Sequence, residues 1–107
     1  MARNESLDRE EKARLLRSLA FRVHRKQPCP QALDDLLGEE SRGGRSRQFR
    51  DAVSRLGEEG VVPALLALDL VGGETAAVLA AVLDTNDHRL LSSALSRLAE
   101  YVEAGAG

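Results

Sequence analysis

The chain has 107 residues, of which 43% are apolar and 30% are charged, and its formal net charge is -2 at neutral pH. This length holds one domain, and the apolar fraction is sufficient for a hydrophobic core, so a two-domain protein and a disordered chain are both excluded. The small negative net charge argues against a surface that binds a polyanion all over, and it leaves room only for a local basic patch.

Helical spacing begins in the first quarter of the chain. Apolar residues recur at intervals of three and four, which places them on one helix face, at Leu16, Leu19, Ala20 and Val23. The pattern predicts a first helix that starts near Ser6 and ends before Pro28, because the residue before a proline is driven out of the helical region. After a turn at residues 27–29, a second helix is predicted over residues 31–40, with Pro30 acceptable at its start.

Three more helices are predicted in the middle of the chain. The third has Ser46 as its N-cap and Gly60 as its C-terminal stop, and its inward positions are Phe49, Ala52, Val53 and Leu56. A short apolar fourth helix has Pro63 in its first turn and runs through Val71. The fifth, over residues 75–83, is nearly all Ala, Val and Leu, and a helix that is apolar on every side is expected at the buried centre.

The sixth helix completes the predicted fold. Asp87 is its expected N-cap, it ends near Glu103, and its apolar stripe consists of Leu91, Ala94, Leu95, Leu98 and Val102. Strand-like alternation is missing, so we predict an all-α fold, a compact bundle of about six short helices. It forms one domain over residues 1–107, with the core at about 7–103 and a flexible tail at 104–107. Val61, Val62 and Leu70 are candidates for pairing with a second copy in a homodimer.

Few residues carry chemistry. Cys29 is the only cysteine, and His24, five positions earlier, lies beyond the i+4 spacing that would pair the two side chains on a helix. Asp84, Asp87 and His88 could ligate a metal ion, but an acidic turn that caps the next helix explains them better. The glycine pairs at 43–44 and 72–73 lack the phosphate-loop pattern. We therefore predict no catalytic residue, no metal and no cofactor, and a protein that is not an enzyme.

Basic residues are concentrated in one half of the sequence. Residues 1–60 hold thirteen of the fifteen Lys and Arg, which gives this half a net charge of +2 against -4 for the rest. Arginines of the first and third helices are the candidate partner-binding residues: Arg14, Arg17, Arg25, Arg45, Arg47 and Arg50. Interleaved acids and the lack of neighbouring aromatics disfavour nucleic acid. An alternative function remains a small helical regulatory protein that binds nucleic acid or a transcription-related partner through this face.

Four short motifs follow the spacing of one family. They are residues 15–20 (LLRSLA), 32–37 (ALDDLL), 49–53 (FRDAV, followed by Gly60) and 94–103 (ALSRLAEYVE). With this spacing the chain resembles, over roughly residues 13–103, the cytoplasmic helical domain of the type II secretion system F family. These are the bacterial inner-membrane platform proteins of type II secretion and type IV pilus machines. Two positions depart from the pattern: Lys26 stands where the family has a turn glycine, and Thr85-Asn86 replace an expected Gly-Glu pair.

The resemblance implies both a fold and a function. It implies a six-helix bundle that acts as a non-enzymatic docking or scaffold module and contacts the assembly ATPase or other subunits of the platform. The longest apolar stretches of the chain have eight residues, whereas a membrane-spanning helix needs about 20. We therefore expect no membrane span in this chain and a cytoplasmic location, at the inner face of the inner membrane through its partners.

Overall fold

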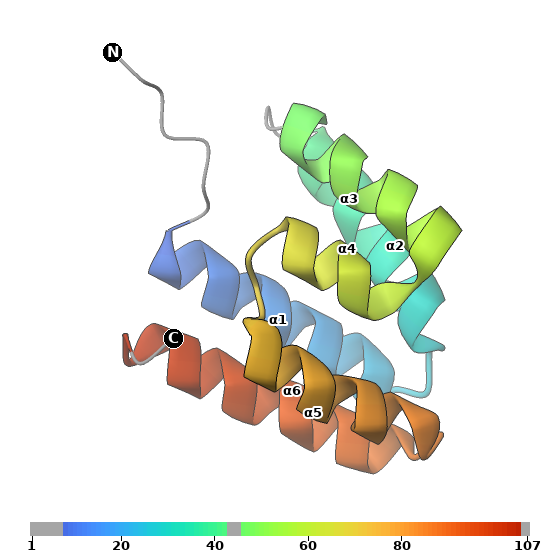
Figure 1. Ribbon diagram of the computed structural model, residues 1–107, viewed down its shortest axis with the longest axis vertical. Helices are drawn as coiled ribbons and strands as arrows, with labels where there is room; N and C mark the ends of the chain where they lie inside the picture. The colour runs from blue at the N-terminus through green and yellow to red at the C-terminus, as the bar shows by residue number, and fades with distance from the viewer. Residues whose placement is uncertain (1–7, 43–45, 106–107) are drawn as a thin grey trace.

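The chain folds into a bundle of helices. The computed structural model describes residues 8–42 and 46–105, without the side chains of 46–48, and contains no strand in these ranges. Its helices are α1 (Arg9–His24), α2 (Cys29–Ser41), α3 (Ser46–Glu59), α4 (Val61–Ala67), α5 (Gly73–Asp84) and α6 (His88–Glu103) (Figure 1). The predicted all-α fold, a compact bundle of about six short helices, is confirmed. No described helix is long and apolar enough to cross a membrane.

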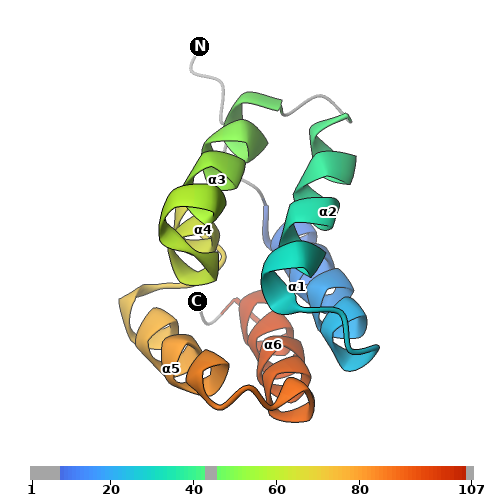
Figure 2. The ribbon, with the colours of Figure 1, turned by 90° about the vertical axis from the view of Figure 1, so that its right-hand side faces the viewer.

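The two longest helices, α1 and α6, have 16 residues each and lie side by side (Figures 1 and 2). They run in opposite directions, so the guanidinium of Arg9 lies next to Gly105. Helix α1 starts with a reciprocal cap, in which Asp8 accepts a hydrogen bond from the Glu11 N–H at 2.8 Å and Glu11 accepts one from the Asp8 N–H at 3.3 Å. The predicted start near Ser6 lies outside the described residues.

Helices α2 and α3 extend the core away from this pair. Helix α2 begins at Cys29, two residues earlier than predicted, because the Pro28 carbonyl already accepts a helical hydrogen bond from the Ala32 N–H at 2.8 Å. Pro30 fits the first turn of the helix, since no hydrogen-bond donor is needed there. Helix α3 packs against α2 and α4 and buries Phe49, as its predicted inward face requires.

Helix α4 ends at Ala67, four residues before the predicted end. The chain turns at Asp69, whose φ of +60° is left-handed, and the Leu70 N–H donates to the Leu65 carbonyl at 2.9 Å. Although it leaves the helix, this linker still packs inward, so Leu70 is only 3% exposed. Val61 is buried as well and Val62 is half-buried. Val61 and Leu70 therefore belong to the chain's own core, and assigning them to a contact with a second copy is wrong.

Helix α5 is peripheral, which contradicts the prediction that it occupies the buried centre. Figure 2 shows it at the edge of the bundle, and it packs against α6 and α4 only. Ala76 and Leu79 are its buried residues, whereas Val78 is 62% exposed. The centre is formed instead by leucines of the other helices, chiefly Leu16, Leu19, Leu37, Leu65 and Leu95. The same apolar composition fits a helix with one open face, which sequence alone does not distinguish.

A short turn joins α5 to α6 and fixes the angle between them. Asn86 adopts a φ of +57°, and the Asp87 side chain accepts hydrogen bonds from the N–H groups of Arg89 and Leu90, at 3.0 and 3.1 Å. The predicted N-cap at Asp87 is therefore confirmed. Because the turn is tight, α5 and α6 form a helical hairpin at one side of the molecule.

Candidate functional site

Two of the arginines predicted to form a basic face make ion pairs with carboxylates of the same chain. Arg14 of α1 makes a two-point ion pair with Glu40 of α2, at 2.9 and 3.1 Å. Arg17 pairs with Glu103 at the end of α6, at 2.5 Å. Hydrogen bonding to these carboxylates raises the pKa of both arginines, and the bond from Arg17 lowers the pKa of Glu103. The two cations thus connect α1 to α2 and to α6.

The remaining arginines of that face do not form one described cluster. The Arg25 guanidinium lies 5.5 Å from the centre of the Phe21 ring, in a cation–π contact. Arg50 is exposed on α3 and borders a hollow that also contains Asp34 and Asp35 of α2. Arg45 lies outside the described residues, as does the side chain of Arg47. A partner-binding role for these six arginines stays a prediction.

The thiol and one imidazole border the same hollow but form no hydrogen bond with each other. Cys29 at the start of α2 and His88 at the start of α6 line a cavity of about 400 Å³, whereas His24 borders a different hollow. Burial raises the pKa of the Cys29 thiol to about 11, so the group is protonated at neutral pH and is a poor nucleophile. Within residues 8–42 and 46–105, no three His, Cys, Asp or Glu side chains gather closely enough to hold a metal ion.

The raised pKa of Cys29 predicts slow alkylation. With a pKa of about 11, the thiolate fraction at about pH 8, and with it the rate of reaction with iodoacetamide, is roughly 100-fold lower than for an unperturbed thiol. The rate should increase about tenfold per pH unit up to the pKa of the buried thiol. Mass spectrometry of timed samples measures it, with the urea-unfolded chain as the control. A native rate that already levels off near the ordinary thiol pKa would contradict the assignment.

An apolar groove lies on the surface between α5 and α6. It has a volume of about 320 Å³, and its lining residues are Thr75, Val78, Leu79, Ala94, Arg97, Leu98 and Tyr101. Two large side chains of this lining remain exposed to solvent: Val78 is 62% and Tyr101 is 48% exposed. A contiguous apolar surface of this kind marks an interaction site more often than isolated exposed leucines do.

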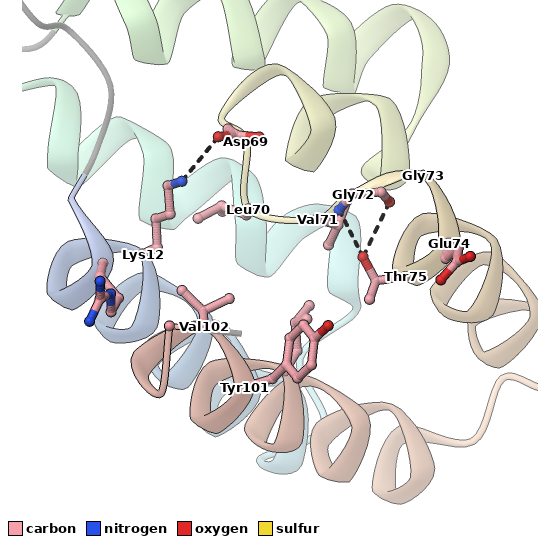
Figure 3. Close-up of a pocket in the computed structure, with 13 residues that line it drawn as sticks. Lys12, Asp69, Leu70, Val71, Gly72, Gly73, Glu74, Thr75, Tyr101 and Val102 are labelled. Carbon is pink, nitrogen blue, oxygen red and sulfur yellow. Dashed lines mark hydrogen bonds and ion pairs between the residues drawn. The ribbon is translucent and has the colours of Figure 1, made fainter. Parts of the chain in front are cut away.

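A larger, more polar hollow of about 590 Å³ lies beside the groove and is shown in Figure 3. Thr75, Leu98 and Tyr101 border both. The Lys12 ammonium reaches across the hollow to the Asp69 carboxylate at 3.0 Å. The Thr75 hydroxyl turns back to Gly72, where it accepts from the N–H at 2.7 Å and donates to the carbonyl at 3.2 Å. These two hydrogen bonds stabilise the N-terminus of α5.

Sequence reasoning missed these groove residues. It placed α5 in the centre and therefore gave Val78 no surface role. A usable signal exists in α6, where Leu90, Ala94 and Tyr101 form a second apolar stripe beside the buried one, with Arg97 between them. Two apolar stripes on one helix indicate that more than one neighbour covers it.

Comparison with known proteins identifies no relative. No family model matches the chain, and no significant match to a curated protein or to a solved structure was found.

Proposed function

We propose that this chain is a non-enzymatic docking module that binds a protein partner in the α5–α6 groove. The observation that carries the proposal is the open face of α5. This helix is apolar almost all round, yet it lies at the edge of the bundle with Val78, Ala77 and Ala81 exposed. Such a helix is normally covered on all sides, so a partner is the natural cover for the open face.

The energetics of the groove fit a modest, reversible association. Burying a whole Val, Leu or aromatic side chain stabilises a complex by about 1.5–3 kcal/mol. Val78 and Tyr101 still have about half of their surface to bury. Leu90 lies outside the groove lining, but it is 45% exposed and shares one face of α6 with Ala94 and Tyr101, so a partner longer than the groove would cover it too. Association also costs entropy, because the partners and their side chains become ordered. No single anchor offsets that cost, so binding should depend on all of them together.

The sequence resemblance supplies the class of partner within this proposal. It favours an assembly ATPase or another subunit of a secretion or pilus platform, with the chain as a scaffold between them. One backbone feature supports it: Lys26 holds a φ of +73° at the position where the family has a glycine. This left-handed conformation favours glycine, so the turn geometry agrees with the family pattern despite the different residue.

Photo-crosslinking in the cells that encode the chain tests the proposal. A benzophenone amino acid placed at Arg97, which is exposed on α6 and lines the groove, should give an adduct with a specific protein. The same group at Glu58, exposed on α3, should not give that adduct. Identical adduct patterns from the two positions, or none from Arg97, would contradict docking at the groove.

Paired substitutions link the adduct to the groove. Tyr101→Gln removes an apolar anchor of the groove but keeps a side chain that is compatible with a helix, so the Arg97 adduct should be lost with the fold intact. Phe21→Gln is the matched control, because Phe21 is 61% exposed but lies on α1 away from the groove. Circular dichroism checks that both variants keep their helical content. Equal loss of the adduct in both variants would point to a general effect on the protein.

A further inference from the structure

We infer that the occupant of the α5–α6 groove is an amphipathic helix of a partner protein whose flanks are acidic. The inference rests on the proposed docking function and adds the chemistry of the partner. It follows from two independent features of the hairpin: the arrangement of its apolar stripes and the charges at the rim of the groove.

The apolar stripes have the form that receives a helix. On α6, Leu90, Ala94 and Tyr101 recur with helical spacing along the exposed side, and Leu90 and Tyr101 are 45% and 48% exposed. On α5, Val78 faces the same groove. Two neighbouring helices with a trough between them accept the apolar face of a third helix, whose anchors are spaced three and four residues apart.

One cation lines the groove and another lines the polar hollow beside it. Arg97 borders the apolar part and Arg9 borders the polar hollow. In residues 8–42 and 46–105, neither of them forms an ion pair. By contrast, the Lys12 ammonium is already neutralised by Asp69. Glu74 borders the hollow too, and Figure 3 shows it on the opposite side of the hollow from Lys12.

These charges select between possible occupants. Carboxylates beside the apolar stripe of an incoming helix would meet Arg97 and Arg9, whereas lysines there would be repelled. A second copy is disfavoured, because a symmetric contact would set the same concave surface against itself, and neither groove supplies a protruding helix. Each ion pair at such an exposed rim contributes about 0.2–1 kcal/mol, so the charges set the preference and the apolar anchors supply most of the affinity.

Three model peptides test the inference with the whole chain. Each has about 18 residues, or five helical turns, with leucines at the spacing of one helix face, and the flanking positions are all Glu, all Gln or all Lys. Fluorescence anisotropy of the labelled peptides at low salt should give the tightest binding for the Glu peptide, roughly tenfold tighter than for the Lys peptide. Arg97→Glu should abolish that difference, while Arg89→Glu, an exposed change on α6 outside the groove lining, should preserve it.

The outcomes separate this inference from the docking function. If all three peptides bind equally and Val78→Gln weakens each of them, the groove docks helices but the acidic partner is overturned. If Val78→Gln weakens none of them, binding lies elsewhere and the groove itself is refuted as the site. A wild-type dimer in analytical ultracentrifugation that dissociates on Val78→Gln would make a second copy the occupant, and would also overturn the inference.

Discussion

Replacing Leu95 with alanine should lower the free energy of unfolding by about 2–5 kcal/mol, the range for removing a fully buried leucine and leaving a cavity. Leu95 is 0% exposed on α6, the helix that lies along α1. A domain of this size is stable by about 5–15 kcal/mol in total. The substitution thus removes a large share of the stability, and urea unfolding followed by circular dichroism measures it as a lower midpoint.

Leu90→Ala is the control for this prediction. Leu90 lies on the same helix but is 45% exposed, so the same chemical change should cost less than about 1 kcal/mol in the free energy of unfolding. If the two variants lost equal stability, the buried and exposed faces assigned to α6 would be wrong. The comparison also bears on function, because Leu90 belongs to the surface proposed to bind a partner and should matter more for binding than for folding.

Much of this fold is predictable from the local sequence. Asp87 and Gly60 mark helix ends by chemistry that acts over a few residues, namely a side-chain cap and a conformation open only to glycine. The end of α4 is different, because the turn at Asp69 depends on Leu70 reaching a buried position. A tertiary contact decides that boundary, and the local apolar run predicts a longer helix.

The candidate site is less predictable than the fold. The arginines stand out in the sequence, but Arg14 and Arg17 find carboxylates on helices 26 and 86 residues away. Neither pairing follows from local spacing. The open face of α5 is hidden for another reason, since an apolar helix has the same composition whether the core or a partner covers it. Only the arrangement of the helices distinguishes these cases.

Gly60→Ala should destabilise the protein by about 1–3 kcal/mol, because it forces a side chain into a backbone conformation reserved for glycine. Gly60 has φ +108° and ψ -172° at the junction of α3 and α4. Its N–H donates to the carbonyls of Arg55 and Leu56, at 3.1 and 3.2 Å, so one residue ends one helix and starts the next. An added Cβ would meet no atom within 4 Å. The loss in urea unfolding would therefore report backbone strain and not a clash.

Gly57→Ala, three residues earlier, should change the free energy of unfolding in the opposite direction. Gly57 lies inside α3, and its added Cβ also meets nothing within 4 Å. Alanine there restricts the unfolded chain and suits the helix, so the free energy of unfolding should increase by about 0.5–1 kcal/mol. The same glycine-to-alanine change is thus expected to stabilise at one position and destabilise at the other. Stabilisation at both positions would show that Gly60 does not adopt this left-handed conformation, and the junction between α3 and α4 described above would then be wrong.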